Sequence, residues 1–131
     1  MNDLYREHIL DHYENPRHHG ELPDADISHE EHNPLCGDRI RIDVAVAEDH
    51  TRASDTRFSG DGCIISQAAA SMLLEAAEGM TLEEIERLEP QFVLDLIGVP
   101  LTANRVKCAL LGLKTLKTGV KQWRIGRASR L

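Results

Sequence analysis

The chain has 131 residues and a mass of 14.7 kDa, which is the size of one domain, so we expect a single domain over residues 1–131. Its net charge of −7 argues against a nucleic-acid partner, because an acidic chain repels phosphate. No segment approaches the ~20 apolar residues of a membrane span, and the charged N-terminus lacks the apolar stretch of a secretory signal. We therefore expect no membrane partner and a cytoplasmic location.

The N-terminal half is predicted to form one helix and a β-hairpin. Residues 3–14 have helical periodicity and end at an Asn-Pro pair. Residues 15–35 are polar and contain several prolines, which predicts an extended loop that is long for a segment without a function. Residues 39–47 alternate between apolar and polar side chains and predict a half-buried strand, paired with a weaker strand over residues 52–60. The first strand is expected to bury Ile40, Ile42, Val44 and Val46 and to turn Arg39, Arg41 and Asp43 to the other face.

The C-terminal half is predicted to be helical. Ser66 is expected to cap a helix that runs to about Glu78. A capping box between Thr81 and Glu84 predicts a short second helix, and Pro90 is well placed as the first residue of a third. The last predicted helix follows Asn104, and its apolar stripe comprises Val106, Ala109, Leu110, Leu113, Leu116 and Val120.

One helix, a small antiparallel sheet and several further helices predict an α+β domain. The charge is unevenly distributed, because residues from Arg105 onward include eight basic groups and no acidic one. Residues 121–131 are therefore predicted to be a basic C-terminal tail, either solvated or able to dock on an acidic protein surface.

Three cysteines, Cys36, Cys63 and Cys108, are spread over the chain. An odd number in a chain expected in the cytoplasm is not a disulfide framework, which leaves inert buried thiols, a reactive thiol or metal ligands. Each cysteine is predicted to lie at the edge of an element, in a loop, a bend and a helix start. The spacings of 27 and 45 residues are not those of a zinc finger, so inert thiols and ligands remain about equally supported.

Residues beside the cysteines suit a metal site. Asp38 can add a carboxylate to the three thiolates and complete a tetrahedral set. Arg105 and Lys107 stand near Cys108 at the predicted helix start, where their charge and the helix dipole favour thiolate over thiol.

Two groups of histidines are weaker candidates for metal binding. His8 and His12 are spaced to chelate from one helix, although a plain helix face is the commoner outcome. His32 lies four residues before Cys36, whereas an exposed and solvated histidine is the commoner outcome there.

Several motifs together resemble the IscU/SufU/NifU N-terminal family of iron–sulfur cluster assembly scaffolds, over nearly the full chain. They are Leu4-Tyr5, His12-Tyr13-x-Asn15-Pro16-Arg17-x-x-Gly20, Asn33-Pro34-x-Cys36-Gly37-Asp38, Phe58-x-Gly60-x-Gly62-Cys63-x-Ile65-Ser66 and Arg105-x-Lys107-Cys108. The resemblance implies a sheet of about three strands packed against several helices. It also assigns Cys36, Asp38, Cys63 and Cys108 as the ligands of a metal or cluster, with the three thiols as sulfur acceptors and with Arg105 and Lys107 in support.

The resemblance combines features of two branches. IscU-like members have a histidine directly before the last cysteine, whereas Lys107 and the Arg-x-Lys-Cys pattern are SufU-like. SufU-like members also carry an insertion of about twenty residues between the second and third cysteines, and this chain lacks it.

The resemblance implies a scaffold or sulfur-transfer protein rather than an enzyme. It would receive persulfide sulfur from a cysteine desulfurase, assemble a transient 2Fe–2S cluster or hold iron, and pass it to apo acceptor proteins or a carrier. Zinc is expected in the isolated protein, and the alternative is a zinc-dependent sulfurtransferase of SufU type that holds no cluster. A zinc hydrolase or deaminase is not supported, because the chain lacks the usual motifs of these enzymes. An enzyme with a cysteine nucleophile would need a histidine base within reach of the thiol, and the sequence leaves that alternative open. A structural zinc module is less well supported, because such sites rarely use a carboxylate ligand.

Overall fold

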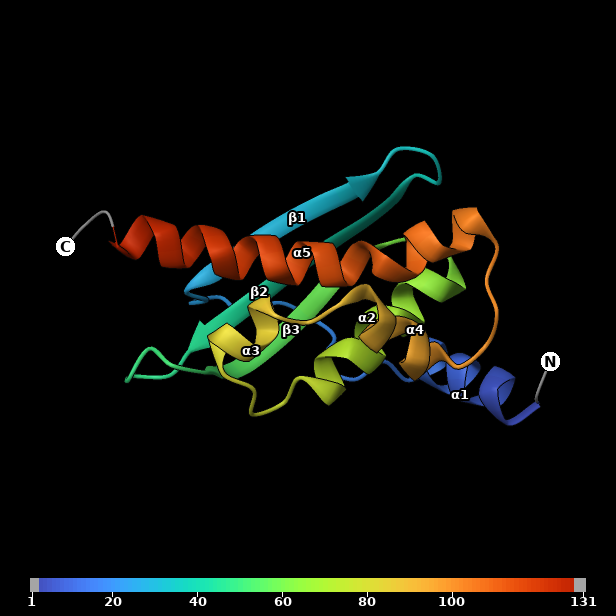
Figure 1. The fold of residues 1–131 in the computed structure, drawn as a ribbon, viewed down its shortest axis with the longest axis horizontal. Helices are drawn as coiled ribbons and strands as arrows, with labels where there is room; N and C mark the ends of the chain where they lie inside the picture. Colours follow the sequence, from blue (N-terminus) through green and yellow to red (C-terminus); the bar gives the residue numbers. More distant parts are fainter. Residues whose placement is uncertain (1–2, 129–131) are drawn as a thin grey trace.

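In the computed structural model, which describes residues 3–128, one helix precedes a three-stranded sheet and four helices follow it (Figure 1). The elements are α1 (Asp3–Glu14), β1 (Ile27–Asn33), β2 (Asp38–Val46), β3 (Ala53–Asp61), α2 (Ile64–Ala76), α3 (Leu82–Glu86), α4 (Pro90–Ile97) and α5 (Ala103–Ala128). The sheet is antiparallel with the order β1-β2-β3, so the predicted α+β class is confirmed. None of the helices in these residues is long and apolar enough to cross a membrane.

Strand β1 lies inside the segment predicted to be a loop, so that prediction is wrong for residues 27–33. The strand pairs with β2 from Ile27 opposite Val44 to Asn33 opposite Asp38. Its sequence, Ile-Ser-His-Glu-Glu-His-Asn, buries only the two end residues, because β1 is an edge strand with charged side chains. The apolar alternation that marks a strand is therefore absent, and pairing with β2 decides the conformation.

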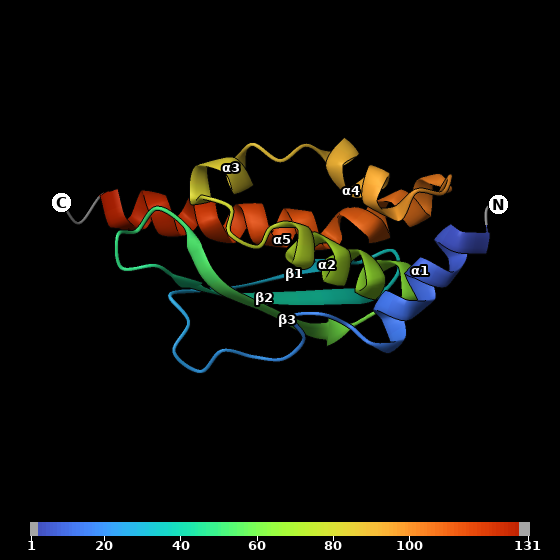
Figure 2. The ribbon, with the colours of Figure 1, turned by 90° about the horizontal axis from the view of Figure 1, so that it is seen from below.

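The helices cover one face of the sheet, and the segment between α1 and β1 passes along the other (Figure 2). Helix α5 lies along β1 and β2, and α2 contacts β3 and α5. On the opposite face Asp43 is only 1% exposed, although the sequence predicts an outward position. It is buried because the Leu22 N–H and the Ser28 hydroxyl donate to its carboxylate, at 3.0 and 2.7 Å.

Helix α2 is the centre of the core and is buried on nearly every side. It begins at Ile64 with Cys63 as its N-cap, so the predicted cap at Ser66 is wrong. The Ser66 hydroxyl lies within the first turn and donates to the Cys63 carbonyl at 3.0 Å. The fully buried residues around α2 come from every layer and include Ile40, Ile42, Val44, Phe58, Ile85, Val93, Ile97, Leu116 and Val120.

The helix boundaries in the C-terminal half follow local sequence chemistry. The capping box between Thr81 and Glu84 is present, and Gly98 ends α4 in the left-handed conformation with φ of 73°. Helix α5 continues to Ala128, so residues 121–128 are helical where the sequence predicted a tail. The remaining residues of that predicted tail, 129–131, lie outside the described part of the chain.

His12 is a core residue that joins α1 to α2. It is 1% exposed, and its Nδ1 lies 2.8 Å from the Ser71 hydroxyl. That hydroxyl accepts the Arg17 N–H at 2.8 Å, so its own proton is free to go to a neutral His12 ring. Burial lowers the pKa of His12, and the positive charges of Arg17 and His8 lower it further.

The buried His12 predicts acid sensitivity. An unfolded histidine has a pKa of about 6.5, so below that pH the unfolded chain binds a proton that the folded protein refuses. We expect the free energy of unfolding to fall as the pH is lowered from about 7 to about 5, and the fall to be smaller for His12→Asn, which keeps a polar partner for Ser71. Urea unfolding at several pH values measures both slopes. His32→Asn is the control, because His32 is 63% exposed, and equal slopes for all three proteins would contradict the assignment.

Candidate metal centre

Three segments distant in the sequence bring the cysteines to one place. Cys36 comes from the turn between β1 and β2, and Asp38 is the first residue of β2. Cys63 is the N-cap of α2, and Cys108 lies in the second turn of α5. The ligand atoms of Cys36, Asp38 and Cys108 lie within 4.8 Å of one another, and the Cys36 and Cys108 sulfurs are 3.3 Å apart. Cys63 joins them through Asp38, whose Oδ2 lies 3.7 Å from the Cys63 Sγ.

Asn33 organises the turn that presents Cys36. Its carbonyl accepts the N–H groups of Cys36 and Gly37 at 3.2 and 2.9 Å, and its side-chain oxygen accepts the Leu35 N–H at 3.2 Å. The other end of the same amide points to Cys108, with Nδ2 3.9 Å from Sγ. Sequence reasoning assigned Asn33 no role, although its position in the Asn-Pro-x-Cys motif marks it.

Asp38 connects the two loops that carry Cys36 and Cys63. Its side chain is buried at the start of β2, with 2% exposed, and Oδ1 accepts the Cys63 N–H at 3.1 Å. One carboxylate oxygen therefore accepts a backbone hydrogen bond, and the other, Oδ2, lies beside the Cys63 sulfur. Gly62 makes room for it, because a Cβ at that position would lie 2.9 Å from Asp38 Oδ1 and 2.4 Å from the Ser66 hydroxyl oxygen.

The cysteines differ strongly in exposure. Cys36 is exposed, Cys63 is half-buried and Cys108 is buried, with 2% exposed. Burial raises the pKa of Cys108, and the neighbouring Cys36, Asp38 and Cys63 raise it further. Desolvation therefore opposes the thiolate form of Cys108, which the helix dipole and the charges of Arg105 and Lys107 are predicted to favour. Cys108 lies in the second turn of α5, where the effect of the helix dipole is weaker than in the first turn.

The two basic residues near Cys108 lie on different sides of α5. Arg105 lines a cavity of about 350 Å³ together with all three cysteines and Asp38. Lys107 lines a neighbouring hollow with His32 and Leu35, because two positions along a helix are about 200° apart. His32 is exposed and lies 3.2 Å from Glu30, away from the three-residue ligand group.

The donor set fits a soft divalent metal. Two zinc–sulfur bonds of about 2.3 Å allow two sulfurs to be up to about 4.6 Å apart, and the Cys36 and Cys108 sulfurs satisfy that limit. Thiolates suit zinc or the iron of a cluster, and a carboxylate is the harder and more weakly bound partner. The assignment of Cys36, Asp38, Cys63 and Cys108 as ligands stays a prediction.

Comparison with known proteins identifies one matching family. The family described as NifU-like N terminal domain matches residues 4–129. The chain belongs to this family. The zinc-dependent sulfurtransferase SufU of Bacillus subtilis is 36% identical to this NifU-like domain over 92% of the chain and 91% of the relative.

Two further proteins are similar to this chain in sequence or in fold. The iron–sulfur cluster assembly scaffold protein IscU of Aquifex aeolicus is 33% identical, over 100% of this NifU-like domain and 86% of the relative. A crystal structure from Fervidobacterium islandicum AW-1, assigned to iron–sulfur cluster assembly in the SUF system, has a TM-score of 0.73 and 28% identity, covering 87% and 94% of the two chains. The relatives thus include both a scaffold and a sulfurtransferase, and both interpretations fit the NifU-like domain.

The close approach of Gly62 to Asp38 and Ser66 gives a test of whether the position of Asp38 matters for metal binding. Gly62→Ala forces Asp38 or Ser66 to move, so we expect a loss of stability of about 1–3 kcal/mol and weaker zinc binding. Thermal unfolding and competition for zinc with a chelator measure the two effects. Gly126→Ala is the control, since a Cβ there meets no atom within 4 Å. Unchanged zinc binding in Gly62→Ala would contradict the expectation that this contact holds Asp38 in place for the metal.

Proposed function

We propose that this NifU-like domain accepts sulfur from a cysteine desulfurase and uses it to assemble and hand on an iron–sulfur cluster of 2Fe–2S type. The observation that carries the proposal is the meeting of three cysteines and a buried aspartate in one open cavity. Thiolates supply the bonds to iron and also the nucleophile for sulfur transfer. Three thiolates and one carboxylate suit a cluster that must leave, because the oxygen ligand exchanges more readily than a fourth thiolate.

Exposure supports Cys36 as the first sulfur acceptor. Its thiolate would attack the outer sulfur of the desulfurase persulfide, forming a new S–S bond while the desulfurase cysteine leaves as a thiolate. The exchange consumes no oxidant or reductant, because one persulfide replaces another. Buried Cys108 is a poor receiver from a bulky partner, but its sulfur lies 3.3 Å from that of Cys36 and is placed to bind what Cys36 brings in.

A zinc-dependent sulfur relay is the second candidate. It is supported by the Arg105-x-Lys107-Cys108 pattern and by the likeness to the Bacillus subtilis sulfurtransferase. In this case zinc at the same four residues is the resident metal and the persulfide is passed on without a cluster. Zinc bound by this chain's cysteines would hold them as thiolates at neutral pH and so offset the raised pKa of Cys108.

Anaerobic reconstitution separates the two candidates. The chain is incubated with cysteine and a cysteine desulfurase, and its persulfide content is measured. Ferrous iron and dithiothreitol are then added, because persulfide sulfur must gain two electrons to become the sulfide of a cluster, and visible absorption is compared with the iron, sulfide and zinc content. Cluster absorption with bound iron and sulfide supports the scaffold, whereas retained zinc with persulfide and no cluster supports the relay. A chain that takes up neither sulfur nor metal would contradict both.

Two substitutions at Asp38 separate its role as ligand from its role in the loop. Asp38→Asn keeps an oxygen for the Cys63 N–H but removes the charge, whereas Asp38→Ala removes both. We expect Asp38→Asn to keep zinc on the three thiolates and to hold an assembled cluster longer with slower transfer. Asp38→Ala is expected to lose in addition about 1–3 kcal/mol of stability through the unsatisfied N–H.

Zinc content, melting temperature and the rate of cluster transfer are measured on both Asp38 variants. Loss of zinc in Asp38→Asn without loss of stability would show that the carboxylate is an essential ligand. Normal transfer by Asp38→Asn would exclude a role in release.

A further inference from the structure

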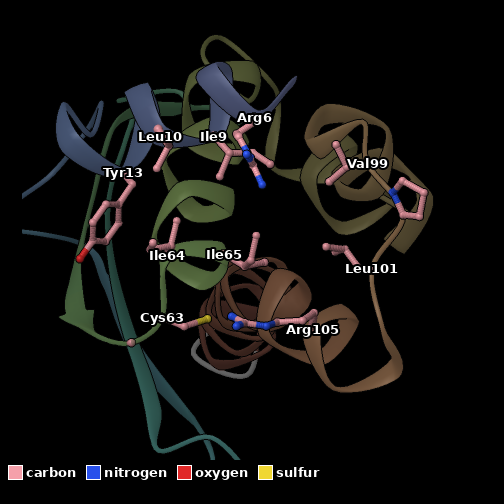
Figure 3. A pocket seen from close by; sticks show the side chains of 12 residues that line it. Arg6, Ile9, Leu10, Tyr13, Cys63, Ile64, Ile65, Val99, Leu101 and Arg105 are labelled. Atoms are coloured by element: carbon pink, nitrogen blue, oxygen red, sulfur yellow. The ribbon is translucent and has the colours of Figure 1, made fainter. Parts of the chain in front are cut away.

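An apolar groove lies beside the metal centre, between α1, the start of α2 and the connection from α4 to α5 (Figure 3). It has a volume of about 570 Å³, within the range of sites that bind ligands or peptide side chains. Ile9, Ile65 and Leu101 form part of its lining. Three large apolar side chains at its margin are unusually exposed: Leu10 at 38%, Tyr13 at 42% and Ile64 at 40%.

The groove adjoins the cavity that holds the cysteines. Gly62, Cys63 and Arg105 line both spaces. A chain segment seated in the groove would therefore end beside the Cys63 sulfur. Contiguous exposed apolar surface in such a place is typical of an interaction site.

Two arginines enter this groove from opposite sides. Figure 3 shows Arg6, from α1, and Arg105, from α5, on either side of the apolar side chains. Within residues 3–128, neither guanidinium has a hydrogen bond or an ion pair. Every other arginine in that range contacts a carboxylate, a carbonyl oxygen or the Trp123 ring.

The absence of a partner among the described residues for the Arg6 and Arg105 guanidinium groups is informative because the chain is acidic. With a net charge of −7, carboxylates are plentiful, yet in the described part of the chain no carboxylate forms an ion pair with either of these two cations. A guanidinium is best satisfied by a carboxylate, which it binds through two parallel hydrogen bonds. An apolar floor between two unpaired cations therefore has the chemistry of a site for an apolar segment that carries a carboxylate.

We infer that the groove binds a short apolar peptide segment containing Asp or Glu, supplied by a partner protein that exchanges sulfur or a cluster with the centre. The inference rests on the proposed function for the identity of that exchange, but not for the chemistry of binding. The apolar side chains of the segment cover Ile65 and Leu101, and its carboxylate lies between Arg6 and Arg105. Binding in this way brings the partner's reactive group to the shared wall at Cys63.

Binding of designed peptides to the zinc-loaded 131-residue chain tests the inference. The probes are fluorescein-labelled peptides with the core Leu-Leu-Glu-Leu and two matched peptides with Gln or Lys in place of Glu. Fluorescence anisotropy is expected to rank them Glu, Gln, Lys in decreasing affinity. Arg6→Gln is expected to weaken the Glu peptide about threefold to tenfold and to leave the Gln peptide unchanged, as for the loss of one exposed charged contact.

Matched variants locate the effect. Arg87→Gln removes an equal charge from an exposed arginine of α3 that pairs with Glu83, and it should bind all peptides as the unaltered chain does. Leu10→Ser should weaken the Glu and Gln peptides alike, because it removes apolar contact. Zinc content is measured on every variant to confirm that the centre is intact.

Three results would overturn the inference: equal affinity for the Glu and Gln peptides, an unchanged Glu affinity in Arg6→Gln, or no binding of any peptide at millimolar concentration. A dimer seen by sedimentation that Arg6→Gln dissociates would assign the groove to a second copy and would also overturn it. Failure of the proposed function is distinguishable, since it would appear as absent zinc or absent sulfur uptake in the unaltered chain, whatever the peptides do.

Discussion

The hydrogen bond from the Cys63 N–H to the buried carboxylate of Asp38 is the contact on which the rest of the centre depends. It joins the start of the central strand β2 to the start of the central helix α2. Each of these elements carries or adjoins a cysteine, so one bond sets the distance between the two loops. A carboxylate with 2% exposure needs such partners, because an unpaired buried charge is costly.

The position of the third cysteine, Cys108, depends on the packing of a helix against the sheet. Helix α5 lies along β1 and β2, and this places Cys108 under the turn that presents Cys36. The result is one exposed, one half-buried and one buried thiol around a single carboxylate. Such a gradient suits a centre in which sulfur arrives at the outer thiol and is then held by the inner ones. Asn33 contacts both the exposed and the buried cysteine, since its backbone carbonyl holds the Cys36 turn and its side chain points to Cys108.

Unpaired arginines and exposed apolar side chains surround the centre, as at a surface that binds other proteins. Six arginines of this acidic chain pair with nearby carboxylates. Within the described residues Arg6 and Arg105 do not; both line the apolar groove, and Arg105 also lines the cavity of the cysteines. Leu35 adds an exposed apolar side chain, at 68%, on the turn beside Cys36. A protein that only stored a metal would have little need for exposed apolar and cationic side chains beside its metal centre. A protein that exchanges sulfur or a cluster with other proteins needs such a surface for docking.

Much of the candidate centre could be predicted from the sequence. The motif around Cys36 and Asp38, the Gly62-Cys63 bend and the Arg105-x-Lys107-Cys108 pattern identified the family and the residues that meet, because these signals are local. The hairpin and the later helices were also predictable, since alternation, the capping box at Thr81 and the glycine at the end of α4 act within a few residues.

Other features were decided only by contacts between distant segments. Strand β1 has no apolar alternation and forms because β2 pairs with it. The raised pKa of Cys108 comes from burial under the Cys36 turn, 72 residues away in the chain. Lys107 and Arg105 are neighbours in sequence but face different cavities, and Arg6 comes to the groove from the other end of the chain. The sequence by itself determined which groups are available for the chemistry. Only the tertiary structure decided which of them are exposed, charged and adjacent, because desolvation and proximity depend on long-range packing.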